Sequence, residues 1–241
     1  MKLRSLLFVP GDRPDRFAKA AASGADALIL DLEDSVAPER KAEARAAIAE
    51  WLAGDRQAPS FVRVNPLDGG QTAADLDAVL GHRPDGLVLP KAEGTASVTR
   101  LLALIGDRPV PPILPIASET PAAVFQLGSY GEVSAHLAGV TWGAEDLPAA
   151  IGAASARNPD GSYTTPYETV RALALFGAHA AGVAAIETVF PNIADGDALA
   201  AYVARGRRDG FSGMMAIHPA QVAAINAGFS PTEAEIAHAR A

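Results

Sequence analysis

The sequence LLFVPGDRPDRFAKAAASGADALILDLED, residues 6–34, contains a complete strand–helix–strand unit. Its first apolar run, residues 6–10, predicts a strand, and residues 13–23 predict a helix that ends at Gly24. A second apolar run, residues 27–32, predicts the next strand. Both runs are almost continuously apolar, which is typical of parallel strands that are buried on both faces. The stretch therefore indicates a βα repeat of a parallel sheet.

The same alternation continues along the rest of the chain. Further strands are predicted at residues 61–65, 86–90, 112–117, 137–142, 184–190 and 213–217. Further helices are predicted at residues 38–52, 72–80, 96–105, 121–127, 167–181, 197–208 and 219–227. Eight strands, each followed by a helix, predict one α/β domain, a TIM (β/α)8 barrel over residues 1–241. An open doubly wound sheet is the alternative, but no Gly-x-Gly-x-x-Gly or Walker pattern follows a strand.

Composition excludes several classes of function. Hydrophobic residues make up 49% of the chain, and the formal net charge of −8 argues against nucleic-acid binding through phosphates. The chain has no cysteine, which excludes disulfides, thiolate nucleophiles, zinc–thiolate sites and iron–sulfur clusters. The first apolar run is too short for a signal peptide or a membrane span. We therefore expect a soluble cytoplasmic protein that binds neither nucleic acid nor membranes.

Polar side chains gather where the predicted strands end, and the active site of a TIM barrel lies at that end. These residues are Asp12, Arg13, Asp31, Glu33, Asp34, Arg63, Asn65, Lys91, Glu119, Glu145, Asp146, Glu187, Asn192 and His218. The starts of the same strands are mostly Ala, Gly, Pro and Leu. A long irregular stretch, residues 147–166, follows the sixth strand, where a barrel places an active-site loop.

The excess of carboxylates at this rim favours a hard divalent cation. Mg²⁺ takes oxygen ligands, usually one or two carboxylates together with waters or substrate oxygens. The absence of cysteine and the presence of only five histidines argue against a soft-metal or three-histidine site. A metal in an open site can chelate an α-hydroxy or α-keto acid. Arg63 could pair with a carboxylate or hold an enolate oxygen, because a guanidinium does not lose its charge.

Seven short motifs span nearly the whole chain. They are residues 4–14 (RSLLFVPGDRP), 31–36 (DLEDSV), 63–65 (RVN), 89–91 (LPK), 118–120 (SET), 143–147 (GAEDL) and 216–222 (AIHPAQV). In this order they resemble the citrate lyase β-subunit-like proteins of the HpcH/HpaI aldolase/citrate lyase family. The resemblance implies a Mg²⁺-dependent barrel that makes or breaks carbon–carbon bonds by Claisen-type chemistry. It also implies substrates such as citramalyl-, malyl- or citryl-CoA, or the corresponding acyl-carrier thioesters.

The resemblance also implies roles for individual residues. Glu119 and Asp146 match the family's two metal ligands, with Glu119 also near the substrate. Arg63 matches the arginine that binds the substrate, and it could stabilise the charge of the enolate. Glu33 and Asp34 lie near the metal by motif, and they could hold its waters and take part in catalysis.

Each of these assignments has a structural alternative. The two metal-ligand candidates could instead cap helices or form salt bridges, and Glu145 could replace Asp146 after a slip of one residue. Arg63 could form a structural ion pair across adjacent strands, with Asp31 or Glu33.

Three further residues have open roles. Arg13 could bind a CoA phosphate, or it could cap the first helix. Lys91 could form a Schiff base in a metal-free aldolase, although the family does not use it in this way. His218 could be a catalytic base or a structural hydrogen-bonding residue.

Two other functions compete with the lyase. A metal-dependent aldolase on free hydroxy-keto acids would use a histidine base near the first strands, and no histidine precedes His82. A noncatalytic subunit that binds an acyl-carrier partner has no need for the arginine and the two metal-ligand candidates. The resemblance further implies a homotrimer. Many relatives carry a C-terminal extension, which we expect this chain, ending at Ala241, to lack.

Overall fold

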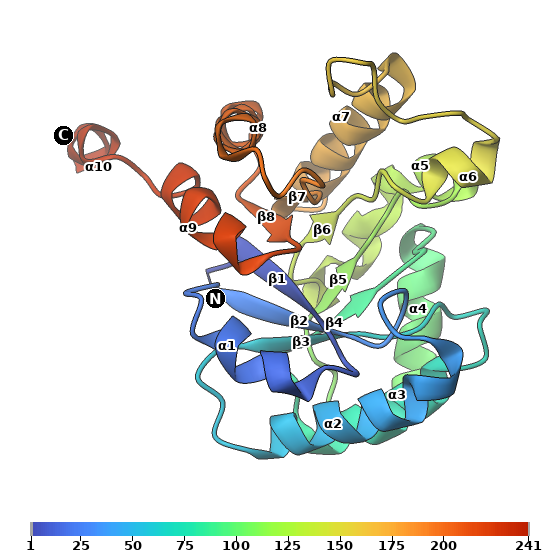
Figure 1. Cartoon of the computed structure of the whole chain (residues 1–241). Helices are drawn as coiled ribbons and strands as arrows, with labels where there is room; N and C mark the ends of the chain where they lie inside the picture. The colour runs from blue at the N-terminus through green and yellow to red at the C-terminus, as the bar shows by residue number, and fades with distance from the viewer. Residues whose placement is uncertain (1, 241) are drawn as a thin grey trace.

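Eight parallel strands form a barrel in the computed structural model, which describes residues 2–240 (Figure 1). The hydrogen-bonded order of the strands is β5-β4-β3-β2-β1-β8-β7-β6. The strands are β1 Ser5–Pro10, β2 Ala27–Asp31, β3 Ser60–Arg63, β4 Gly86–Leu89, β5 Ile113–Pro115, β6 Val140–Thr141, β7 Ala185–Glu187 and β8 Gly213–Ala216. Each lies within, or within one residue of, a strand expected from the sequence. The predicted single-domain TIM barrel is confirmed.

The barrel closes through a sparse contact between its two end strands. Isolated parallel bridges join Ile113 to Leu137 and Ile116 to Thr141. The Ala117 N–H also donates to the carbonyl oxygen of Thr141 over 2.9 Å. This seam between β5 and β6 has fewer paired residues than the β1–β2 ladder, which pairs five residues on each strand. The sheet is therefore closed, and isolated bridges rather than a continuous ladder join its two end strands.

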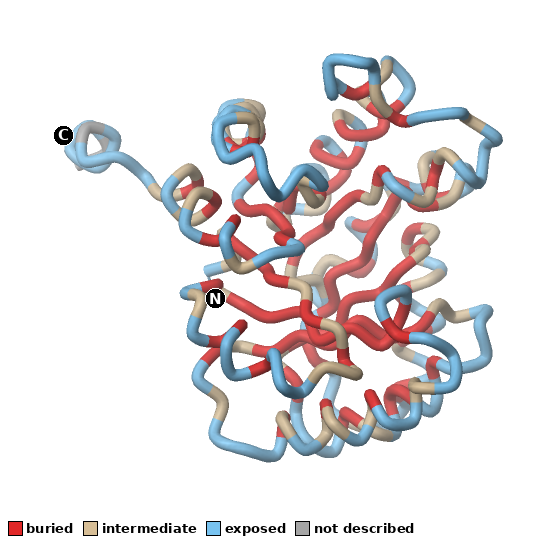
Figure 2. The backbone as a smooth tube through the Cα atoms, in the orientation of Figure 1, coloured by how far each residue is buried: buried red, intermediate tan, exposed pale blue. Residues whose placement is uncertain are grey.

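Most helices surround the barrel and bury one face, whereas the last helix lies away from the barrel and its described residues are exposed (Figures 1 and 2). The α-helices are α1 Phe17–Ala21, α2 Lys41–Ala53, α3 Thr72–Val79, α4 Gly94–Ile105, α5 Pro121–Val124, α6 Leu147–Ile151, α7 Thr165–Ala180, α8 Gly196–Asp209, α9 Pro219–Gly228 and α10 Glu233–Arg240. The 3₁₀ helices are η1 Pro14–Arg16, η2 Pro38–Arg40, η3 Leu80–His82 and η4 Leu127–His136. Among the helices of residues 2–240, none has the length and apolar character needed to cross a membrane.

Three helical segments depart from the expectations. The stretch 147–166, expected to be irregular, contains α6, whose five residues are too few to show an apolar period. Proline lies in the first turn of α6, and Gly152 ends it with a left-handed φ of 69°. The 3₁₀ helix η4 and the terminal helix α10 were also not expected, because 3₁₀ spacing and a polar eight-residue helix leave no 3.6-residue apolar stripe.

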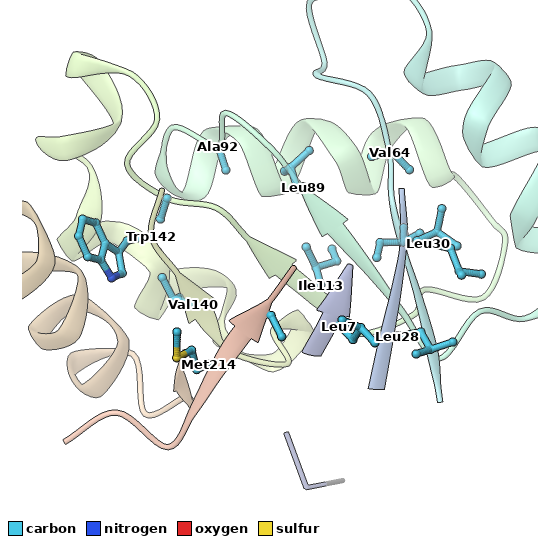
Figure 3. Packing of buried hydrophobic residues seen from close by; sticks show 14 of the residues in the cluster. Leu7, Leu28, Leu30, Val64, Leu89, Ala92, Ile113, Val140, Trp142 and Met214 are labelled. Atoms are coloured by element: carbon cyan, nitrogen blue, oxygen red, sulfur yellow. The ribbon is translucent and has the colours of Figure 1, made fainter. Parts of the chain in front are cut away.

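Alternate residues of the strands supply two separate apolar layers. The inward-facing residues fill the barrel and include Leu6, Ala27, Ile29, Phe61, Val88, Leu114, Ile186 and Met215. Their neighbours along the strands face the helices and include Leu7, Leu28, Leu30, Leu87, Ile113, Ala185 and Met214, several of which are shown in Figure 3. Gly86 makes room for the inner layer, because a Cβ there would lie 2.1 Å from the Phe61 ring. This alternation decides which polar residues point into the barrel mouth.

Candidate active site

Arg63 ends β3 with its side chain facing into the barrel mouth, and it forms a two-pronged ion pair with Asp31. The two residues are in register on β3 and β2, with Arg63 Nε 2.6 Å from Asp31 Oδ1 and Nη2 2.7 Å from Oδ2. Burial opposes ionisation of Asp31, but Arg63 holds the pKa of this carboxyl below its usual value. The remaining nitrogen, Nη1, lies 2.8 Å from Glu33 Oε2. The expected alternative for Arg63, an ion pair with Asp31 or Glu33, is therefore confirmed for both partners.

Lys91, one residue beyond Pro90 at the end of β4, contacts three carboxylates. Its Nζ lies 2.7 Å from Glu33 Oε1 and 3.0 Å from Asp146 Oδ2. Its backbone N–H donates to Glu119 Oε2 over 2.6 Å. Burial opposes the charge, but the neighbouring carboxylates raise the pKa of Lys91 well above its usual value. A protonated ammonium is not a nucleophile, so the geometry gives no support to the Schiff-base alternative.

Glu119 follows β5 and is almost fully enclosed, with 7% of its surface exposed. A Cβ on residue 143 would lie 2.7 Å from Glu119 Cγ, so Gly143 provides the space that this side chain occupies. Burial, with additional repulsion from Glu33 and Asp146, raises the pKa of Glu119 to about 8. The site thus holds a carboxyl group whose negative charge the protein compensates poorly.

Asp146, rather than Glu145, faces the buried side of the loop after β6. Asp146 Oδ2 is shielded from solvent and receives no well-aligned hydrogen bond, although Lys91 Nζ is close. Glu145 is exposed and pairs with Arg157, whose Nη2 lies 3.3 Å from Glu145 Oε1. The sequence left Glu145 and Asp146 as alternative metal ligands, and the geometry favours Asp146.

These side chains line one small cavity of about 110 Å³ at the carboxyl ends of the strands. Its charged lining residues are Asp34, Arg63, Glu119, Glu145 and Asp146. Asp34 is exposed, and its Oδ2 lies 3.8 Å from Arg63 Nη1. Glu33 is buried behind the cavity, held by Arg63 and Lys91, and burial raises its pKa. The structure therefore brings together five of the six expected site residues, namely Glu33, Asp34, Arg63, Glu119 and Asp146.

The donor set fits a small divalent cation. Asp146 supplies a buried oxygen without a hydrogen bond, and Glu119 supplies a poorly compensated carboxylate. Within residues 2–240, no group of three or more His, Cys, Asp or Glu side chains is arranged to hold a metal. Two protein carboxylates with open positions are what Mg²⁺ commonly uses, because it keeps waters or takes substrate oxygens as the other ligands.

A larger groove of about 510 Å³ adjoins the cavity, and Phe8 lines both. The groove lies between β1 with the helical turn that follows it and the β8–α9 connection, and Arg16, Lys19 and His218 contribute polar lining. The sequence analysis missed Arg16 and Lys19. Their spacing of three residues within a helix was the available signal, since it puts two cations on one helical face.

Three other rim residues lie away from the cavity or have structural partners. Arg13 stands at the N-cap position of η1, but its guanidinium pairs with Asp15 at 2.9 Å and lines neither cavity nor groove. His218 Nδ1 accepts the Ala220 N–H over 3.2 Å, which makes it the N-cap of α9. Glu187 is buried on the helix-facing side of β7, because its strand position alternates with the inward-facing Ile186.

Sequence comparison decides the family. The model of the HpcH/HpaI aldolase/citrate lyase family matches residues 4–219. The chain belongs to this family. The resemblance drawn from the seven motifs is confirmed.

Relatives of the HpcH/HpaI family align with almost the entire chain. A citrate lyase subunit β-like protein from Mycobacterium tuberculosis is 36% identical over 240 residues, covering 97% of this chain and 81% of the relative. A (3S)-malyl-CoA thioesterase from Cereibacter sphaeroides is 34% identical over 237 residues, covering 97% and 79%. The crystal structure of CitE from M. tuberculosis with magnesium, acetoacetate and coenzyme A superposes with a TM-score of 0.84 at 34% identity, covering 98% of this chain and 84% of that one.

Proposed function

We propose that this protein is a Mg²⁺-dependent carbon–carbon lyase that acts on a hydroxyacyl-CoA thioester such as citramalyl-, malyl- or citryl-CoA. The observation that carries the proposal is the convergence of Glu119, Asp146 and Arg63 on one cavity beside a basic groove. The cavity suits the short acid portion of the substrate, and the groove suits the long, phosphate-bearing CoA portion. The family, and the CitE structure with magnesium and coenzyme A, support this assignment.

Glu119 and Asp146 would hold the Mg²⁺ ion. When bound, the ion supplies an electrophilic centre that chelates and polarises the oxygens of the hydroxy or keto acid. The poorly compensated charge of Glu119 and the buried oxygen of Asp146 are the features of this chain that support the assignment.

The side chains around the cavity would divide the remaining work. A carboxylate takes the hydroxyl proton, the carbinol carbon becomes a carbonyl as its bond to the α-carbon breaks, and the electron pair remains on the thioester fragment as an enolate. A proton delivered to the α-carbon from the protonated carboxyl or from water then gives acetyl-CoA. Asp34 is suited to the proton transfer, because it lines the cavity and is exposed enough to exchange protons with water. Arg63 is suited to stabilise the enolate oxygen through one N–H of Nη1, since Asp31 occupies Nε and Nη2 and Glu33 takes only the other side of Nη1. Glu33 holds Arg63 Nη1 and Lys91 in place.

Product analysis tests the reaction. Malyl-, citramalyl-, citryl- and 3-hydroxy-3-methylglutaryl-CoA are incubated with the protein in Mg²⁺ or in EDTA, and the products are separated by chromatography. We expect acetyl-CoA and a keto acid from at least one thioester, in Mg²⁺ only. Release of free CoA and the intact hydroxy acid would instead identify a thioesterase. Cleavage of free hydroxy-keto acids alone would favour the aldolase, and Mg²⁺ binding without any turnover would favour a noncatalytic subunit.

The basic groove makes a prediction about substrate binding. Replacing both Arg16 and Lys19 with alanine is expected to raise KM for the CoA thioester by about tenfold or more, because charge-assisted contacts to phosphate are lost. The kcat should change little, since neither side chain reaches the reacting carbons. The same double variant should leave KM unchanged for an N-acetylcysteamine thioester, which lacks the phosphates. An equal rise in KM for both substrates would contradict the assignment of the groove.

Mg²⁺ binding is expected to release protons near neutral pH. Burial and the neighbouring carboxylates raise the pKa of Glu119 to about 8, so the metal-free group is mostly protonated at pH 7. Because the ion needs the carboxylate, its apparent affinity should rise with pH and level off above about 8. Calorimetry in two buffers of different ionisation enthalpy should show nearly one proton released at pH 7 and almost none at pH 9.5. Identical heats in the two buffers at pH 7 would refute this linkage.

The homotrimer, the cytoplasmic location and the missing C-terminal extension stay predictions.

A further inference from the structure

We infer that Lys91 is a tethered counter-cation that neutralises Glu33 and Asp146 in the metal-free protein and competes with Mg²⁺ for Asp146. The inference rests on the proposed metal site, and it adds a regulating element to that site. Lys91 would then act as a positioning residue that sets how tightly the ion is held, without contacting the reacting atoms.

The charges around the cavity show why such a cation is needed. Asp31 is neutralised by the two-pronged pair with Arg63, which leaves three carboxylates close together: Glu33, Glu119 and Asp146. Arg63 reaches Glu33 with its third nitrogen. Of the basic side chains that the structure describes, only Lys91 pairs with Asp146. Its ammonium therefore occupies the electrostatic position that a bound cation would otherwise fill.

The backbone holds Lys91 in this place at a conformational cost. Its φ of +50° lies in the left-handed region, which lysine adopts far less readily than glycine or asparagine. The same residue donates its N–H to Glu119 Oε2 while Nζ approaches Asp146. Strained conformations of this kind persist where several contacts determine them together, and they concentrate at functional sites. One residue thus links both proposed metal ligands, through its main chain to one and through its side chain to the other.

Opposite effects on Mg²⁺ affinity distinguish competition from simple support. If Lys91 only braces the site, removing its side chain loosens Asp146 and weakens Mg²⁺ binding. If Lys91 competes, removing its positive charge relieves repulsion of the ion and tightens binding. The two roles therefore predict changes of opposite sign for the same substitution.

Calorimetric titration with MgCl₂ provides the test, on wild type, Lys91→Met, Lys91→Asn and Lys91→Arg. We expect the Kd for Mg²⁺ to fall about tenfold in Lys91→Met and Lys91→Asn, the size expected for removing one charge near a divalent ion, and to remain near wild type in Lys91→Arg. Methionine keeps much of the aliphatic stem, whereas asparagine tolerates the left-handed backbone, so agreement between the two assigns the effect to charge. An unchanged or higher Kd in both neutral variants overturns the inference.

Thermal unfolding gives a second readout that does not depend on turnover. In EDTA, Lys91→Met should melt below wild type, because Glu33 and Asp146 then lose the cation that they share. Saturating Mg²⁺ should raise its Tm more than it raises that of wild type. If wild type binds Mg²⁺ and Lys91→Met shows an equal or smaller rise in Tm, the inference alone fails. If wild type binds no Mg²⁺, the proposed metal site fails together with the inference.

Discussion

Glu119→Gln is expected to abolish measurable Mg²⁺ binding and to lower kcat/KM by on the order of a thousandfold. The amide keeps the shape that fits against Gly143, so the barrel should fold normally. Unlike the carboxyl of Glu119, which ionises when the metal binds, the amide cannot supply the negative charge that the ion needs. Calorimetry and steady-state kinetics on the best thioester measure the two effects.

A matched control variant shows whether the effect comes from the position of Glu119 or from any Glu→Gln change. Glu132→Gln makes the same change at an exposed position on η4 and should leave both Mg²⁺ affinity and kcat/KM at wild-type values. Because the metal-free carboxyl of Glu119 is mostly protonated at pH 7, replacing it with a neutral amide should leave the stability of Glu119→Gln in EDTA close to that of wild type. Full Mg²⁺-dependent turnover by Glu119→Gln would refute the role of this residue.

The largest effect on stability is expected at Glu187, which is fully buried between β7 and the helices. Its Oε1 accepts hydrogen bonds from Trp142 Nε1 at 2.6 Å and from the Tyr202 hydroxyl at 3.0 Å, and its Oε2 accepts from Arg171 Nε at 2.7 Å. Glu187→Ala leaves the Trp142 and Tyr202 donors without this acceptor, and the buried Arg171 guanidinium keeps only Asp209, 2.7 Å from its Nη1. We expect the free energy of unfolding to fall by about 3–5 kcal/mol.

Urea denaturation measures this loss, with a surface pair as the comparison. Glu168 forms an ion pair with Arg205 in which both side chains are 31% exposed, so Glu168→Ala should cost less than about 1 kcal/mol. The two substitutions remove the same side chain and differ mainly in burial. A loss below about 1 kcal/mol for Glu187→Ala would show that the buried network contributes little to stability.

The sequence predicted the barrel well because a strand buried on both faces leaves a continuous apolar run. It also predicted that Arg63, Glu119 and Asp146 would meet, since the ends of parallel strands converge on one rim. It did not predict the direction of Glu187, because a one-residue difference in strand position turns a side chain from the mouth to the helix layer. The left-handed Lys91 was equally hidden, because no local pattern marks a lysine with a positive φ.

Because the seam between β5 and β6 is sparsely paired, a metal bound there would also stabilise the closed barrel. Glu119 follows β5 and Asp146 follows β6, so the two proposed ligands lie on opposite sides of this sparsely paired junction. A cation held by both would bridge the two strand ends, and local separation of the strands would break its coordination. The free energy of binding the ion would then also oppose local opening of the barrel at this junction. Amide hydrogens along the junction would therefore exchange more slowly as the ion concentration rises.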